Sequence, residues 1–103
     1  MTGYDFHPEA LLDLDEIWEF IAGDNPAAAD RVIADILGTL DKLVTFPNQG
    51  HSRPDLTSRP IRSTLVREYL IACAPDEKPL WVVAVMHGRR SPRVMAAILR
   101  GRE

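Results

Sequence analysis

The feature that most constrains the fold is a pair of helical apolar patterns separated by almost no loop. From Pro8 to about Asp24, and again from Pro26 to Val44, apolar residues recur at steps of three and four, which places them on one face of a helix. Asn25 is a favoured N-cap, and proline suits the first helical position, so the second helix begins at once. Two helices joined this closely must form an antiparallel hairpin.

Short β-strands are predicted on either side of the hairpin. Tyr4–His7 alternates apolar and polar residues and stops at Pro8. Phe46-Pro47 ends the second helix, and a loop through Pro54 and Pro60 follows. Three β-rich runs come next, namely Ile61–Arg67, Tyr69–Ala74 and Leu80–His87. Short connections between them predict an antiparallel meander, and the nearly unbroken apolar run in the last one predicts a central strand covered on both faces.

The expected fold class is α+β, with all 103 residues in one domain and a short final helix or tail from Pro92 to Arg100. The composition, 46% hydrophobic and 26% charged, excludes a disordered chain. Gly38 interrupts the second helix, which favours close packing at that point. Cys73 lies in an apolar run, so we expect a reduced core thiol and a cytoplasmic setting. No segment resembles a signal peptide or a membrane span.

The two halves of the chain carry opposite charge. Residues 1–50 hold two basic and ten acidic side chains, giving −8, whereas residues 51–103 hold ten basic and five acidic ones, giving +5, and the sum is the formal −3. An anionic partner is therefore expected at the C-terminal half.

Several kinds of chemistry are not expected from these residues. The histidines are far apart, the one cysteine lies in a strand, and the glycines do not match a phosphate-binding loop, so neither a metal nor a cofactor is expected. Asp13, Glu16 and Glu19 share one helix at three-residue spacing and could act in acid/base chemistry, but we interpret them as a solvated face.

The more informative cluster is His87-Gly88-Arg89-Arg90-Ser91-Pro92-Arg93, directly after the last strand. Arginine side chains bind phosphate or carboxylate in a fork geometry, and a histidine can transfer protons. Arg59, Arg62 and Arg67 belong to the neighbouring segment and are candidates for the same face. The alternatives are that these arginines make a sheet edge soluble, or that they bind acidic side chains of a partner.

The order of these elements resembles the RelE/ParE toxin superfamily over nearly the whole chain. The matching pieces run from the first helix through the helix-to-loop passage to the sheet: Tyr4, Pro8, Ala10, Asp13-Leu14, Ile17-Trp18, Asn25-Pro26, Ala28-Ala29, Leu40, Leu43, Phe46-Pro47, Gly50, Arg53-Pro54, Leu56, Arg67, Tyr69-Leu70-Ile71, Val85 and His87-Gly88-Arg89. The first helix and the Asn25-Pro26 junction look like plasmid-stabilisation toxins of the ParE branch.

The superfamily holds two activities, so the fold alone does not decide the function. The ribosome-dependent ribonucleases of the RelE branch carry a basic residue where this chain has Leu70, and an aromatic or acid-base group on the final helix where this chain has Ala96. They are also usually basic proteins, as RNA binding favours. A ribonuclease here would have to use Arg90 with His87 and Arg62 or Arg67.

The resemblance therefore favours the ParE branch, whose members inhibit DNA gyrase without being enzymes. It implies a ParD-like antitoxin with an amphipathic, acidic segment as partner, gyrase as target, and operator DNA bound only through the antitoxin. Candidate contact residues for the target or partner are Arg67, His87, Arg89, Arg90 and Arg93. A RelE-like endoribonuclease and a non-toxic antitoxin-binding module remain as alternatives.

Overall fold

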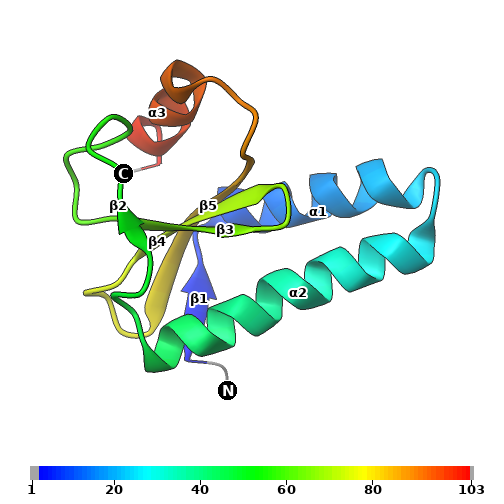
Figure 1. Ribbon diagram of the computed structural model, residues 1–103, viewed down its shortest axis with the longest axis horizontal. Helices are drawn as coiled ribbons and strands as arrows, with labels where there is room; N and C mark the ends of the chain where they lie inside the picture. Colours follow the sequence, from blue (N-terminus) through cyan, green and yellow to red (C-terminus); the bar gives the residue numbers. More distant parts are fainter. Residues whose placement is uncertain (1–2, 103) are drawn as a thin grey trace.

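The computed structural model describes residues 3–102 and has the α+β architecture that the sequence predicts. A five-stranded sheet carries a long helical hairpin on one face and a short helix on the other (Figure 1). In chain order the elements are β1 (Tyr4–Phe6), α1 (Pro8–Ala22), α2 (Pro26–Thr45), β2 (His51–Ser52), β3 (Arg62–Val66), β4 (Tyr69–Ala74), β5 (Leu80–His87) and α3 (Pro92–Arg100).

The strands lie in the order β1-β5-β4-β3-β2. β3, β4 and β5 form the predicted antiparallel meander, and β1 pairs in parallel with the first residues of β5, so that Phe6 lies opposite Val82. Between β1 and β5 the chain passes through the hairpin, β2, β3 and β4, and this long connection allows the parallel pairing. β1 is short, and β5 continues beyond its end.

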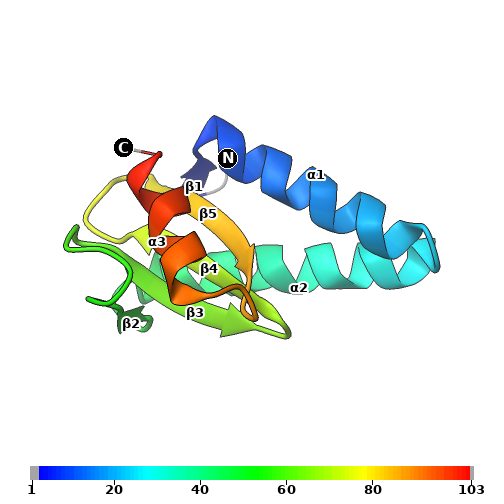
Figure 2. The same cartoon turned by 90° about the horizontal axis from the view of Figure 1, so that it is seen from above.

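The hairpin forms because each of its helices is capped and has one apolar face. The Asn25 side chain accepts a hydrogen bond of 3.1 Å from the backbone N–H of Ala28, and Pro26 follows at the first helical position. The apolar faces of α1 and α2 pack on one side of the sheet, with Leu14, Ile36 and Ile71 in one core. The far end of the hairpin extends beyond the sheet (Figures 1 and 2).

A second core lies on the opposite face of the sheet. α3 turns Met95 and Leu99 against Leu70 and Met86, and the loop before β3 adds Leu56. Figure 2 shows α3 crossing this face, with α2 behind the sheet. β5 therefore contributes to both cores, as predicted for a central strand covered on both faces.

Three details differ from the sequence-based expectations. β2 was not expected, because two residues carry no periodic pattern; it pairs with Arg62 and Ser63 of β3. β3 is one residue shorter at each end than the predicted run Ile61–Arg67. Its C-terminal end is set by Arg67, which adopts a left-handed backbone with φ 54° that turns the chain into β4. Gly38 is exposed, and a methyl group there would meet nothing within 4 Å, so close packing does not explain this glycine.

Among the described residues, no helix combines the length and the apolar character that crossing a bilayer requires.

Candidate partner-binding site

The basic segment, residues 87–93, begins where β5 leaves the sheet. Gly88 donates its backbone N–H to the Glu68 carbonyl at 2.7 Å, and a Cβ at Gly88 would approach that carbonyl oxygen to 3.2 Å. The close approach explains a glycine at this turn. The Ser91 hydroxyl then accepts the N–H of Val94 at 3.2 Å and caps α3. The turn and the cap together place three arginines, Arg89, Arg90 and Arg93, at the surface.

His87 is held by three neighbours. Its ring meets Tyr69 edge-on with centroids 5.4 Å apart, Nδ1 accepts the backbone N–H of Arg89 at 3.1 Å, and Nε2 lies 3.4 Å from a carboxylate oxygen of Glu68. An imidazole whose Nδ1 accepts a hydrogen bond carries its proton on Nε2 when neutral. Burial, with a smaller effect of Glu68, raises the pKa of the Tyr69 hydroxyl above its ordinary value. This environment orients His87 within the fold.

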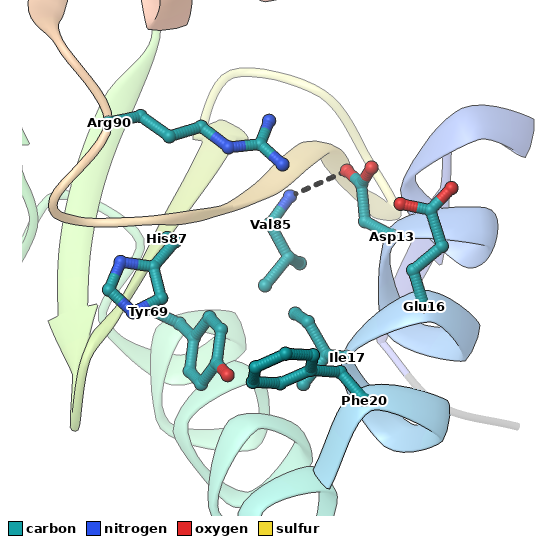
Figure 3. A pocket seen from close by; sticks show the side chains of 8 residues that line it. All are labelled: Asp13, Glu16, Ile17, Phe20, Tyr69, Val85, His87 and Arg90. Atoms are coloured by element: carbon teal, nitrogen blue, oxygen red, sulfur yellow. Dashed lines mark hydrogen bonds between the residues drawn. The ribbon is translucent and has the colours of Figure 1, made fainter. Parts of the chain in front are cut away.

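Two hollows meet at Arg90. The first, which we call the hairpin hollow, has a volume of about 370 Å³ and is lined by Asp13, Glu16, Ile17, Phe20, Tyr69, Val85, His87 and Arg90. In Figure 3 the Arg90 guanidinium extends over this hollow toward the two carboxylates, while the rings of Tyr69 and Phe20 lie on its other side. Phe20 is 82% exposed, so the hollow has an apolar wall open to a partner.

The second hollow lies on the other face of the sheet. This α3 hollow has a volume of about 460 Å³ and is lined by His51, Arg53, Ser63, Leu65, Leu70, Gly88, Arg90, Pro92 and Met95. Leu65 is 64% exposed there, and Arg53 is held by two hydrogen bonds to Asp55 at 2.8 and 2.9 Å. Arg90 of the basic segment lines both hollows, and each hollow also has apolar side chains in its wall. Such a composition suits a protein partner with acidic and apolar groups.

The structure does not bring every predicted site residue to this surface. Arg67 forms an ion pair with Asp35 of α2, with Nε and Oδ2 2.6 Å apart, and lines a separate hollow beside α2. Arg62 donates to the Gly50 carbonyl at 2.6 Å, and Arg59 donates to the Leu99 carbonyl at 2.9 Å. These three side chains hold the turn, the loop and the end of α3, respectively. His87, Arg89, Arg90 and Arg93 stay together in the basic segment.

Other residues of the surface were missed from the sequence. His51 and Arg53 reach the α3 hollow because β2 pairs with β3, and two residues of strand leave no pattern to detect. Asp13 was interpreted as part of a solvated face, which is wrong: its side chain is 14% exposed and paired with Arg102. Within residues 3–102 no three metal-binding side chains come together in a group that could hold an ion.

A sheet of this order, with a helical hairpin on one face and a basic segment leading into a short helix on the other, defines an α+β protein of the RelE/ParE toxin superfamily. The sequence model described as "ParE toxin of type II toxin-antitoxin system, parDE" matches residues 4–92, so the chain belongs to the ParE toxin family, and a cognate antitoxin is its partner. A protein of Sinorhizobium fredii (strain NBRC 101917 / NGR234) named "Putative toxin Y4kP" is 34% identical over 93 residues, covering 84% of this chain and 88% of that protein.

Proposed function

We propose that this ParE-family toxin inhibits DNA gyrase in the bacterial cytoplasm, and that a ParD-like antitoxin neutralises it by covering the basic segment. The observation that carries the proposal is the exposed position of Arg89, Arg90 and Arg93, whose side chains form no ion pair with any residue between 3 and 102. Unpaired arginines around apolar hollows favour recognition of an acidic protein surface. Family membership supports gyrase as the target.

The same surface suits the antitoxin. A disordered acidic and amphipathic segment can fold over a large surface as it binds, with its carboxylates on the arginines and its apolar residues in the two hollows. Its removal by proteolysis would free the toxin, which is the basis of plasmid stabilisation. Operator DNA would be bound by the antitoxin alone, because the toxin itself has a net charge of −3.

A ribonuclease is the second candidate function, and one observation favours it. His51, Arg53 and Arg90 border the same α3 hollow, and an imidazole with two guanidinium groups can serve phosphodiester cleavage. Two other observations weigh against it. A ribonuclease would use Arg62 or Arg67 with Arg90 and His87, but both arginines line other hollows. In addition, Asp55 already pairs with Arg53.

The test is induction of the protein in a bacterial host, with plasmid supercoiling and transcript integrity measured in the same culture. The proposal expects relaxed or cleaved plasmid with intact transcripts. R89A/R90A/R93A should abolish the effect, whereas Arg31→Ala, which removes an exposed arginine from α2, should not. Cleaved transcripts with normal supercoiling would establish the ribonuclease instead. Normal growth with neither effect would leave an antitoxin-binding module that is not toxic.

A further inference from the structure

Arg102, which follows α3, forms a nearly buried ion pair with Asp13 of α1. Both terminal nitrogens of Arg102 donate to the Asp13 carboxylate, with Nη1–Oδ2 and Nη2–Oδ1 distances of 2.5 and 2.9 Å. The two side chains are only 12% and 14% exposed, and Glu9 lies 3.8 Å from Nε of Arg102. A fork-to-fork pair of this kind is directional as well as strong. We call Asp13 and Arg102 the C-terminal latch.

The latch also forms hydrogen bonds with the part of the β5 edge that has no neighbouring strand. β1 ends opposite Val82, so the edge of β5 beyond this point has no strand beside it. There the Val85 N–H donates to Oδ2 of Asp13 at 3.0 Å, and the Val83 carbonyl accepts from Nη1 of Arg102 at 3.2 Å (Figure 3 shows the first bond). The Asp13 carboxylate thus satisfies a donor of the sheet edge, and the Arg102 guanidinium satisfies an acceptor.

α3 depends on its contacts with the rest of the molecule, and the latch adds to the packing of its apolar face. The helix has nine residues, too few for stability on its own, and only Met95 and Leu99 of its side chains are buried. Arg59 adds one hydrogen bond to the Leu99 carbonyl. The basic segment leads directly into α3, so a loosened helix would also release the arginines from their fixed positions.

We propose that Asp13 and Arg102 are positioning residues: their ion pair keeps α3 docked on the sheet and thereby holds the basic segment in the geometry that the acidic partner surface binds. The functional half of this inference rests on the proposed inhibition of gyrase. If only a fraction of the molecules has α3 docked, the apparent affinity equals the affinity of the docked form multiplied by that fraction, even though no contact residue has changed. The latch would therefore set the potency of the toxin through the docking of α3, and Arg102 does so without lining either hollow.

The experiment compares Arg102→Met with Arg100→Met, which removes an exposed arginine two residues earlier. Hydrogen exchange of the full-length variants reports the docking of α3 and the Val85 amide, and a supercoiling assay with purified gyrase reports the half-inhibitory concentration. For Arg102→Met we expect the amides of α3 and of Val85 to lose most of their protection against exchange. The half-inhibitory concentration should rise about tenfold, as it does when only about one molecule in ten has α3 docked. Exchange in β4 should stay as in the wild type, and Arg100→Met should leave α3 protected.

Arg102→Lys keeps the charge but cannot form the fork, so it should give intermediate values, and it serves as the test variant if Arg102→Met does not fold. Adding Asp13→Asn to Arg102→Met should cost less than the two single changes together. Unchanged exchange in α3, or complete loss of its protection without loss of potency, would overturn the proposal. If the wild-type protein does not inhibit gyrase at all, the proposed function fails, and the exchange comparison still decides whether the latch holds α3.

Discussion

Arg90 differs from the two arginines beside it because its side chain borders both hollows, whereas Arg89 and Arg93 line neither. A partner segment that fills either hollow must therefore pass close to its guanidinium. Central arginines surrounded by apolar contacts contribute more to binding than arginines at the rim. In a gyrase supercoiling assay, Arg90→Ala should raise the half-inhibitory concentration about tenfold, and Arg93→Ala by about threefold or less. Equal effects of the two substitutions would show that the hollows do not take part.

Cys73 offers a test of the core at the same scale. Burial raises the pKa of its thiol from an ordinary value of 9.0 to about 12. The thiolate, which is the reactive form, is thus scarce at neutral pH, so an alkylating reagent should modify the native protein very slowly and the denatured protein rapidly. Because the folded state holds this proton more tightly than the unfolded state, the contribution of Cys73 to stability should be fully present below pH 9 and be lost as the pH rises toward 12. Rapid modification of the native protein at pH 7 would contradict the buried position of the side chain.

At the scale of the element, α2 contains a glycine that its surroundings do not require. Gly38 lies on the exposed side of the helix, and an added methyl group would meet no atom within 4 Å. Gly38→Ala should therefore stabilise the protein by about 0.5–1 kcal/mol, since alanine loses less backbone entropy in a helix. The measurement is the melting temperature in thermal unfolding. Ala34→Gly, the opposite change at another exposed position of α2, serves as the control. A lower melting temperature for Gly38→Ala would mean that the helix needs its flexibility there.

The elements that were predicted correctly share a signal that is local in sequence. α1 and α2 show periodicity over several turns and cap residues at their starts, and the meander strands are apolar runs between short turns. β2 has only two residues, and its pairing is set by the position of β3 rather than by its own composition. The end of β3 depends on a left-handed residue, Arg67, which is not an amino acid that favours this conformation.

At the scale of the whole molecule, the parts of the partner-binding surface that were predicted are local in sequence, and the parts that were missed depend on contacts between distant residues. His87, Arg89, Arg90 and Arg93 are neighbours in sequence, so one turn keeps them together wherever the strand ends. The sequence predicts that Arg67 lies on the same surface as these residues. In the structure it instead pairs with Asp35 of α2, beside a separate hollow. The C-terminal latch joins residues 89 positions apart, and no spacing rule connects such residues before the fold is known.

The charge separation along the chain leads to a prediction about rates. The arginines of the basic segment lie in the +5 half of the chain, and the −8 half contains the hairpin that extends beyond the sheet. Exposed charges act over roughly 8 Å at physiological salt, so long-range attraction should speed the encounter with an acidic surface and weaken as salt is added. We expect the association rate constant with immobilised gyrase to fall about tenfold between low and physiological ionic strength.

R89A/R90A/R93A should flatten this salt dependence, while Arg31→Ala, which removes a positive charge from the acidic half, should leave it as steep as in the wild type. Surface plasmon resonance at several salt concentrations separates the association rate from the dissociation rate. If the triple variant keeps the salt dependence, the electrostatic contact lies on another part of the molecule. The arginines of the basic segment would then only make the end of the sheet soluble. A slope lost only in the triple variant would identify residues 89–93 as the part of the toxin that its acidic partner meets first.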